Sequence, residues 1–94
     1  MRSYELGVVL HPALEEADVT QAVEKLSGYL KAGGSVTSVN VWGKRSLAYP
    51  IRRQHEGIYA FFHAQIEPRS IGELERNLKL DEKVLRYLLI QSEA

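Results

Sequence analysis

The side chains with the clearest chemical potential gather in residues 41–51, Val-Trp-Gly-Lys-Arg-Ser-Leu-Ala-Tyr-Pro-Ile. Between Lys44 and Arg53 there are four cations and no carboxylate. Aromatic rings can stack on bases and cations can neutralise phosphates, so this combination on an exposed strand favours an RNA-binding surface. Residues 5–24 carry acids but no Lys or Arg, so the charge of the chain is segregated. The alternative is therefore two solvated patches, one basic and one acidic, without a partner.

Six cations are candidates to contact phosphates, and two aromatic residues are candidates either to stack on a splayed base or to pack locally. These predicted RNA-binding residues are Arg2, Lys44, Arg45, Arg52, Arg53, Arg86, Trp42 and Tyr49. Lys44 and Arg45 are adjacent in an extended chain, and neighbouring side chains of a strand point to opposite faces. We therefore expect only one of these two to reach RNA directly.

Catalysis and metal binding find little support in the residue types. His11, His55 and His63 fall before a proline, in a predicted turn and on a predicted strand, without the spacing of a zinc site. The sequence has no Gly-rich phosphate loop, no nucleophile elbow and no cysteine. We predict no enzyme activity, no cofactor, no metal ion and no small-molecule substrate.

The periodicity of apolar residues predicts the elements that position these side chains. Alternation of Tyr4, Leu6, Val8 and Leu10 predicts a strand over residues 3–10, and helical spacing from Val19 to Leu30 predicts a helix that ends at Gly33-Gly34. The other predicted elements are a strand over 36–51, a connection over 52–57, a strand over 58–67, a helix that begins at Ser70, and a strand over 84–91.

Single residues add local detail to these elements. Gly43 inside a strand indicates a bulge, and Pro50 places that strand at the edge or end of a sheet because proline donates no ladder hydrogen bond. Ser70 followed by Glu73 predicts a capping box at the start of the second helix.

The order βαββαβ in a chain of 94 residues with 45% hydrophobic content predicts one domain over residues 1–94. Its fold class is α+β, a ferredoxin-like sandwich with a four-stranded antiparallel sheet and two helices on one face. The other face of the sheet is then open to a partner.

Parity along the third predicted strand assigns side chains to the two faces. If Ala60, Phe62, Ala64 and Ile66 face the helices, then Tyr59, Phe61, His63 and Gln65 face outward; Arg86 outward places Leu85, Tyr87 and Leu89 inside. Two exposed aromatic residues together mark an interface with a protein or an RNA partner, so Tyr59 and Phe61 are the candidates for that contact. Reversed parity, with Phe61 in the core, is the alternative.

The string Trp42-Gly43-Lys44-Arg45-Ser46-Leu47-Ala48-Tyr49-Pro50-Ile51 resembles the signature of the bacterial small-subunit ribosomal protein six family, and Arg2-x-Tyr4-Glu5 and Pro12 also match it. The resemblance implies a cytoplasmic structural constituent of the small (30S) ribosomal subunit. It further implies binding to the central domain of small-subunit (16S) ribosomal RNA, together with ribosomal protein eighteen docked on the open face and the exposed strand edge. Tyr59 and Phe61 are then the predicted contacts with that partner protein.

A second function remains open for the same fold. The segment Gly57-Ile58-Tyr59-Ala60-Phe61-Phe62 is distantly similar to the aromatic strand of an RNA-recognition motif, a module that stacks single-stranded bases. Glu56 stands where that motif has a cation, and the first strand offers Glu5 and Gly7 outward rather than an aromatic residue.

No apolar run approaches the roughly 20 residues that span a bilayer, and the amino terminus lacks the apolar core of a signal peptide, so we expect a soluble intracellular protein without a membrane partner. Many members of the similar family carry a charged tail after the last strand. Because this sequence ends at Gln91-Ser92-Glu93-Ala94, we expect any partner contact of such a tail to be absent or reduced.

Overall fold

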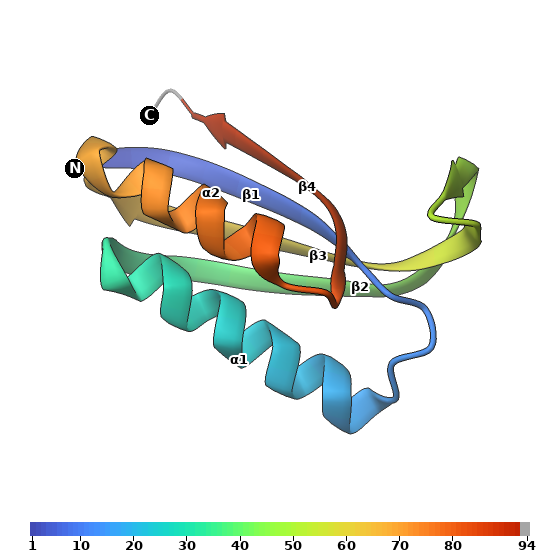
Figure 1. Ribbon diagram of the computed structural model, residues 1–94. Coiled ribbons are helices and arrows are strands. Elements are labelled where there is room, and N and C mark those ends of the chain that lie inside the picture. Colours follow the sequence, from blue (N-terminus) through green and yellow to red (C-terminus); the bar gives the residue numbers. More distant parts are fainter. Residues whose placement is uncertain (93–94) are drawn as a thin grey trace.

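Over residues 1–92, which a computed structural model describes, the backbone forms a four-stranded antiparallel sheet with two helices on one face (Figure 1). The elements in chain order are β1 (Arg2–Leu10), α1 (Glu16–Ala32), β2 (Gly34–Ile51), β3 (Gln54–Ile66), a 3-10 helix η1 (Pro68–Ser70), α2 (Ile71–Leu80) and β4 (Val84–Gln91). The strand order is β2-β3-β1-β4, so β2 and β4 are the edges. The predicted ferredoxin-like sandwich is confirmed.

The core lies between the sheet and the helices, where the predicted alternation places it. Every second residue of the two central strands is buried: Tyr4, Leu6, Val8, Leu10, Ile58, Ala60, Phe62, Ala64 and Ile66. They pack against the helix stripes that contain Leu26, Leu30, Leu74 and Leu78. Burying one large apolar side chain contributes roughly 1.5–3 kcal/mol, so this layer supplies the main driving force for folding. The parity that turns Tyr59 and Phe61 outward is confirmed.

Strand β2 is an edge strand, as Pro50 predicted, and it is interrupted three times. Its register with β3 shifts between Val36 and Ser38, between Val41 and Gly43, and between Ser46 and Ile51. Gly43 has a φ of +83°, a conformation that glycine adopts without steric strain, so the predicted bulge is confirmed. The third interruption is the largest, since residues 47–50 face a single residue of β3.

The turn between β2 and β3 differs from the prediction. A connection over residues 52–57 was expected, but only Arg52 and Arg53 form the turn, and β3 already begins at Gln54. Both arginines have positive φ, 48° and 67°, as in the tight type I′ hairpin turns usually built from Asn and Gly. Asn-Gly or Asp-Gly pairs signal such a turn in a sequence, whereas a pair of arginines does not, so the predicted connection is too long.

The predicted capping box at Ser70 is wrong. Ser70 has helical backbone angles and its side chain caps no amide, because the chain enters α2 through the 3-10 turn η1 with Pro68 at its start. A backbone hydrogen bond of that turn stands in place of the predicted side-chain cap: Ser70 N–H donates to the carbonyl of Glu67 at 2.9 Å.

The end of α1 meets the sheet so closely that two glycines are required for space. Gly33 is the C-cap, as predicted, and its N–H donates to the carbonyl of Leu30. A Cβ at Gly33 would lie 2.6 Å from the Cβ of Ser70, and a Cβ at Gly34 would collide with the backbone carbonyl of Gln65. Glycine at both positions therefore lets the helix, β3 and η1 approach each other.

Two polar contacts tie the second helix to its neighbours. Asp81, which follows α2, lies 3.8 Å from the Nζ of Lys25 on α1; a hydrogen bond with Tyr29 and then this carboxylate raise the pKa of Lys25 above its usual value. On the other side, the hydroxyl of Tyr87 donates to Glu75 at 3.2 Å, and burial followed by the charge of Glu75 raises the pKa of Tyr87.

Replacing Tyr87 with phenylalanine is expected to lower the free energy of unfolding by about 1 kcal/mol at neutral pH, since a hydrogen bond between β4 and α2 is lost. In the wild type the folded state holds the tyrosine proton to a higher pH than the unfolded state. Stability from this group is therefore complete below about pH 10 and decreases as the pH rises through the raised pKa. Urea denaturation of both proteins at neutral and alkaline pH measures the effect; equal alkaline losses in the two would contradict it.

Within residues 1–92 neither helix has the length and apolar character needed to cross a membrane. The expected loss of tail contacts concerns Glu93 and Ala94, which lie outside the described residues.

Candidate nucleic-acid and partner interface

The face of the sheet opposite the helices is organised in three rows, because directly paired residues of neighbouring strands project to the same side. The rows are His63–Glu5–Ile90, Phe61–Gly7–Leu88 and Tyr59–Val9–Arg86, each taken from β3, β1 and β4 in turn. We call these nine residues the open face. Four of its six residues on β3 and β4 are aromatic or aliphatic, so its character is mainly apolar.

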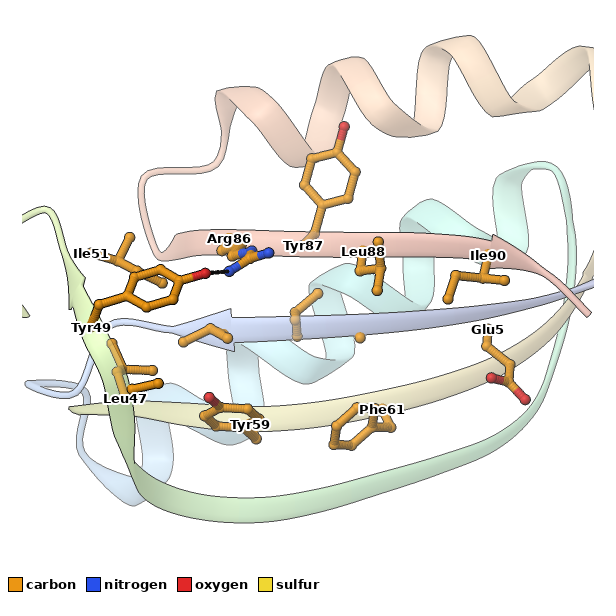
Figure 2. A pocket seen from close by; sticks show the side chains of 14 residues that line it. Glu5, Leu47, Tyr49, Ile51, Tyr59, Phe61, Arg86, Tyr87, Leu88 and Ile90 are labelled. Carbon is orange, nitrogen blue, oxygen red and sulfur yellow. Dashed lines mark hydrogen bonds between the residues drawn. The ribbon is translucent and has the colours of Figure 1, made fainter. Parts of the chain in front are cut away.

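Residues 47–51 of β2, which we call the hairpin arm, bend over one end of the open face. They leave the ladder after the pair Ser46–Glu56 and rejoin it only at Ile51–Gln54. In Figure 2 the ring of Tyr49 reaches toward β4, where Arg86 Nη1 donates a hydrogen bond to the tyrosine hydroxyl at 3.2 Å. The arm and β4 thus close one end of the open face.

A hollow of about 310 Å³ lies between the arm and the open face, and we call it the trough. Gly7 and Val9 on the middle strand β1 form its floor. Its walls contain Phe61 and Tyr59 on β3 and Leu88 on β4 (Figure 2). A Cβ at Gly7 would lie 3.2 Å from the ring of Phe61, so the ring leans over the glycine. The two predicted partner contacts, Tyr59 and Phe61, are therefore neighbours in one concave apolar surface, with ring centroids 6.4 Å apart.

Trp42 belongs to the same surface by packing. Its ring centroid lies 4.7 Å from that of Phe61, with the ring planes tilted by 54°, while half of the tryptophan remains exposed. Of the two roles left open for Trp42 and Tyr49, local packing is observed for Trp42 and a hydrogen bond to Arg86 for Tyr49. Both keep large exposed areas, 50% for Trp42 and 62% for Tyr49, that a partner can cover.

The bulge at Trp42 determines toward which face of the sheet each of the neighbouring cations Lys44 and Arg45 projects. Lys44 pairs with the core-facing Ile58, whereas Arg45 pairs with Gly57, which has the parity of Tyr59. Arg45 therefore projects to the side of the open face and Lys44 to the side of the helices. Both are exposed, at an end of the sheet where the hairpin extends away from the helices (Figure 1).

We call the end of the sheet that carries the turn at Arg52 and Arg53 the hairpin end. All the predicted cations except Arg2 lie there. Arg52 and Arg53 are exposed in the turn, and Arg86 is exposed on β4 beside the arm. Arg2 lies at the opposite end of β1, paired with Ile66, about 26 Å along the strand from Leu10 at roughly 3.3 Å per residue. Arg2 and the hairpin cations therefore form separate parts of the surface.

One cation near this end was missed by the sequence analysis. Lys79, in the last turn of α2, lines a second hollow of about 280 Å³ together with Arg52 and Arg86. No sequence signal joins these residues, since they come from a turn, a helix and a strand, and Arg52 precedes Lys79 by 27 residues. Three cations around one concavity are suited to phosphate groups, which bind arginine and lysine donors.

The positive charge at the hairpin end has no ion-pair partner among the residues that the structure describes. Among residues 1–92, no carboxylate lies within 4.0 Å of a charged nitrogen of Lys44, Arg45, Arg52, Arg53 or Arg86. At the other end of the trough, Glu5 lies 3.7 Å from Nδ1 of His63. The open face therefore has a cationic end and an end with a carboxylate.

The histidines are not assembled into a site. In the part of the chain that the structure describes, no three His, Cys, Asp or Glu side chains are placed to hold a metal ion. His11 has a structural contact instead, because its Nδ1 accepts the N–H of Ala13 at 3.1 Å.

Comparison with known proteins gives consistent matches over the whole chain. The sequence model described as ribosomal protein S6 matches residues 3–91. The small ribosomal subunit protein bS6 of Nocardia farcinica is 44% identical over 97% of this chain and 97% of its own length, and that of Saccharopolyspora erythraea is 48% identical over 97% and 78%. The crystal structure of 30S ribosomal protein S6 from Thermotoga maritima superposes with a TM-score of 0.91 over 97% of this chain and 87% of that chain, at 22% identity, which supports the fold.

Proposed function

Because the chain belongs to the ribosomal protein S6 family, and is thus a structural constituent of the small ribosomal subunit, we propose that it binds 16S ribosomal RNA in the central domain together with ribosomal protein eighteen. In this proposal the 94 residues act as one domain without catalytic activity. The observation that carries the proposal is the positive charge at the hairpin end, which lies beside an apolar trough and forms no ion pair within residues 1–92. A polyanion and a protein surface can be bound there side by side.

The RNA contacts are assigned to the hairpin end. Arg45, Arg52 and Arg53 project from a hairpin that extends beyond the helices, so their guanidinium groups are accessible to phosphates of folded RNA. Arginine presents several donors in a planar fork that fits phosphate oxygens, and these contacts fix position rather than read sequence. Lys44, Lys79 and Arg86 add charge at the same end, and Arg2 supplies a separate contact at the other end of the sheet.

The protein partner is assigned to the trough. Tyr59 and Phe61 are half-buried there, and Leu88 and Ile90 are 58% and 48% exposed although they are aliphatic. A contiguous apolar patch bordered by polar groups is typical of a protein interface. Stacking of single-stranded bases is the less favoured function, because the central strand β1 presents Glu5, Gly7 and Val9 on this face and no aromatic ring.

Neutralising the hairpin cations tests the RNA contact. The triple variant Arg45→Gln, Arg52→Gln, Arg53→Gln is expected to bind central-domain RNA more weakly and with less salt dependence. Each lost phosphate contact lowers the slope of log affinity against log salt by about 0.7 to 0.9, so three contacts lower it by roughly 2 to 3. Filter binding of the preformed protein pair across a salt series measures the slope.

The control is a triple variant with the same change of charge at exposed cations of α1, η1 and α2: Lys31→Gln, Arg69→Gln and Arg76→Gln. This variant should keep the wild-type slope. The affinity of the hairpin variant for protein eighteen should also be unchanged. Identical slopes for wild type and hairpin variant would mean that this segment serves the fold rather than the RNA. Equal competition by unrelated single-stranded RNA would instead favour the base-stacking module.

A further inference from the structure

Resting on the proposed function, we propose that the second hollow, around Lys79, binds one unstacked nucleotide of the RNA. We call this concavity of about 280 Å³ the cationic hollow. It lies between the last turn of α2, the start of β4 and the turn at Arg52, and it shares Arg86 and Tyr87 with the trough. The phosphate of the nucleotide lies among the cations, and its base lies against the apolar part of the lining.

Three cations from three different elements line the cationic hollow. Arg52 comes from the turn, Lys79 from the last turn of α2 and Arg86 from β4, and all three are exposed. Within residues 1–92, no carboxylate lies within 4.0 Å of a charged nitrogen of any of them. Arginine and lysine donors form the strong, charge-assisted hydrogen bonds that hold phosphate oxygens. Their charge is therefore available to a phosphate group.

Two acidic side chains near the cationic hollow are engaged elsewhere. The side chain of Asp81 is 6% exposed; it accepts the N–H of Lys83 at 3.0 Å and lies 3.8 Å from the Nζ of Lys25 on α1. Glu75 accepts the hydroxyl of Tyr87 at 3.2 Å. Neither of these two carboxylates belongs to the lining of the hollow. A phosphate seated among the three cations is therefore not displaced by either acid.

The apolar part of the lining favours a nucleotide over a bare phosphate. It consists of the buried side chains Leu78, Val84 and Leu85. The volume of about 280 Å³ is close to the lower end, about 300 Å³, of pockets that hold small organic ligands. A phosphate alone would leave the aliphatic groups uncovered, whereas the flat face of a base covers them. The lining thus fits an anionic group that carries a ring.

The free edge of β4 supplies hydrogen-bonding groups beside this apolar surface. Ser92 N–H donates to the carbonyl of Ser3, so by antiparallel alternation the N–H and C=O of Tyr87 point away from β1. The side chain of Tyr87 extends toward α2 and leaves this backbone edge accessible (Figure 2). One donor and one acceptor can therefore pair with the edge of a base. A base within a duplex has that edge occupied, so the nucleotide must be unpaired and unstacked.

The backbone of the hairpin supports a role for Arg52 at this place. Arg52 adopts a positive φ of 48°, and such unfavourable conformations of residues with side chains are concentrated at functional sites. The hydroxyl of Tyr49 accepts a hydrogen bond from Arg86 Nη1 at 3.2 Å, which holds the hairpin arm against β4. The turn and this contact together bring Arg52 to the same hollow as Lys79.

Titration of the isotope-labelled protein with each ribonucleoside monophosphate, followed by nuclear magnetic resonance, tests the hollow without ribosomal RNA. At least one monophosphate is expected to shift the backbone amide signals of Lys79, Leu85 and Tyr87. Its nucleoside and inorganic phosphate, which each lack one part of the ligand, should bind more weakly. Equal binding of inorganic phosphate and all monophosphates, or no shift at these amides with any of them, would overturn the inference.

Charge removal identifies the residues that hold the phosphate. Lys79→Gln and Arg52→Asn are each expected to weaken binding of the monophosphate roughly threefold, as expected for one exposed charge contact. Asparagine is chosen at position 52 because it tolerates positive φ. The control Arg76→Gln removes the same charge from α2 at an exposed position outside the lining, and it should bind like the wild type. Equal affinities for all three variants would contradict the site.

Binding of central-domain RNA by the preformed protein pair separates this inference from the proposed function. Lys79→Gln is expected to lower the slope of log affinity against log salt by about 0.7 to 0.9, the contribution of one phosphate contact, whereas Arg76→Gln should not change it. A wild-type pair that does not bind this RNA would refute the proposed function, and the monophosphate titration would still decide the hollow. Wild-type binding that Lys79→Gln leaves unchanged would refute the hollow alone.

Discussion

Replacing Phe62 with alanine is expected to lower the free energy of unfolding by about 3–5 kcal/mol, the range for truncating a buried aromatic side chain. Phe62 is 1% exposed and lies beside Leu6 in the ladder between the two central strands. The cavity would open at the centre of the sheet, where neighbouring strands cannot move in to fill it. Urea denaturation followed by circular dichroism measures the loss.

The adjacent residue is a matched control for this substitution. Phe61→Ala removes the same side chain from the opposite face of the same strand, where it packs against Trp42 and over Gly7. It should cost much less stability than Phe62→Ala, since it leaves a surface depression rather than a cavity. Equal losses for the two variants would contradict the assignment of faces on which the candidate interface depends.

Replacing Phe61 with glutamate is expected to leave the fold intact and to weaken binding of protein eighteen by roughly 30-fold or more. A charge would be desolvated against the apolar wall of the trough, which costs on the order of 2 kcal/mol or more when no partner group compensates it. Calorimetric titration of the variant with purified protein eighteen gives the affinity.

Gln65→Glu is the matched control for that experiment, because it adds the same charge to the same face of β3, two rows from Phe61 and outside the lining of the trough. It should bind like the wild type. A folded Phe61→Glu variant with wild-type affinity would remove Phe61 from the interface.

Much of the fold could be predicted because its signals are local. Alternation in β1 and β3 and the apolar stripe of α1 reflect a sheet buried on one side. The branched and aromatic residues of β4 predict that strand with its observed bounds. The capping box failed because Ser and Glu at the right spacing do not reveal that Pro68 begins a 3-10 turn. The hairpin turn failed because tertiary structure holds two arginines in a conformation that their side chains do not favour.

The sequence predicts most residues of the candidate site, but not the contacts between them or the trough that they form. Tyr49 and Arg86 were each singled out, yet their contact joins positions 37 residues apart and depends on the four-residue excursion of the hairpin arm from the ladder. The same excursion creates the end wall of the trough. Lys79 escaped notice because only the packing of α2 brings it near the hairpin end.

The turn at Arg52 and Arg53 has a consequence for how this sequence can change. Left-handed backbone costs a residue with a side chain roughly 1–2 kcal/mol, and here two consecutive arginines adopt it, with φ of 48° and 67°. Asn-Gly in their place would relieve the strain and remove both charges. The hairpin most stable in isolation is therefore not the one that carries charge to its tip. Selection for the proposed RNA contact and selection for thermostability would favour different residues at these two positions.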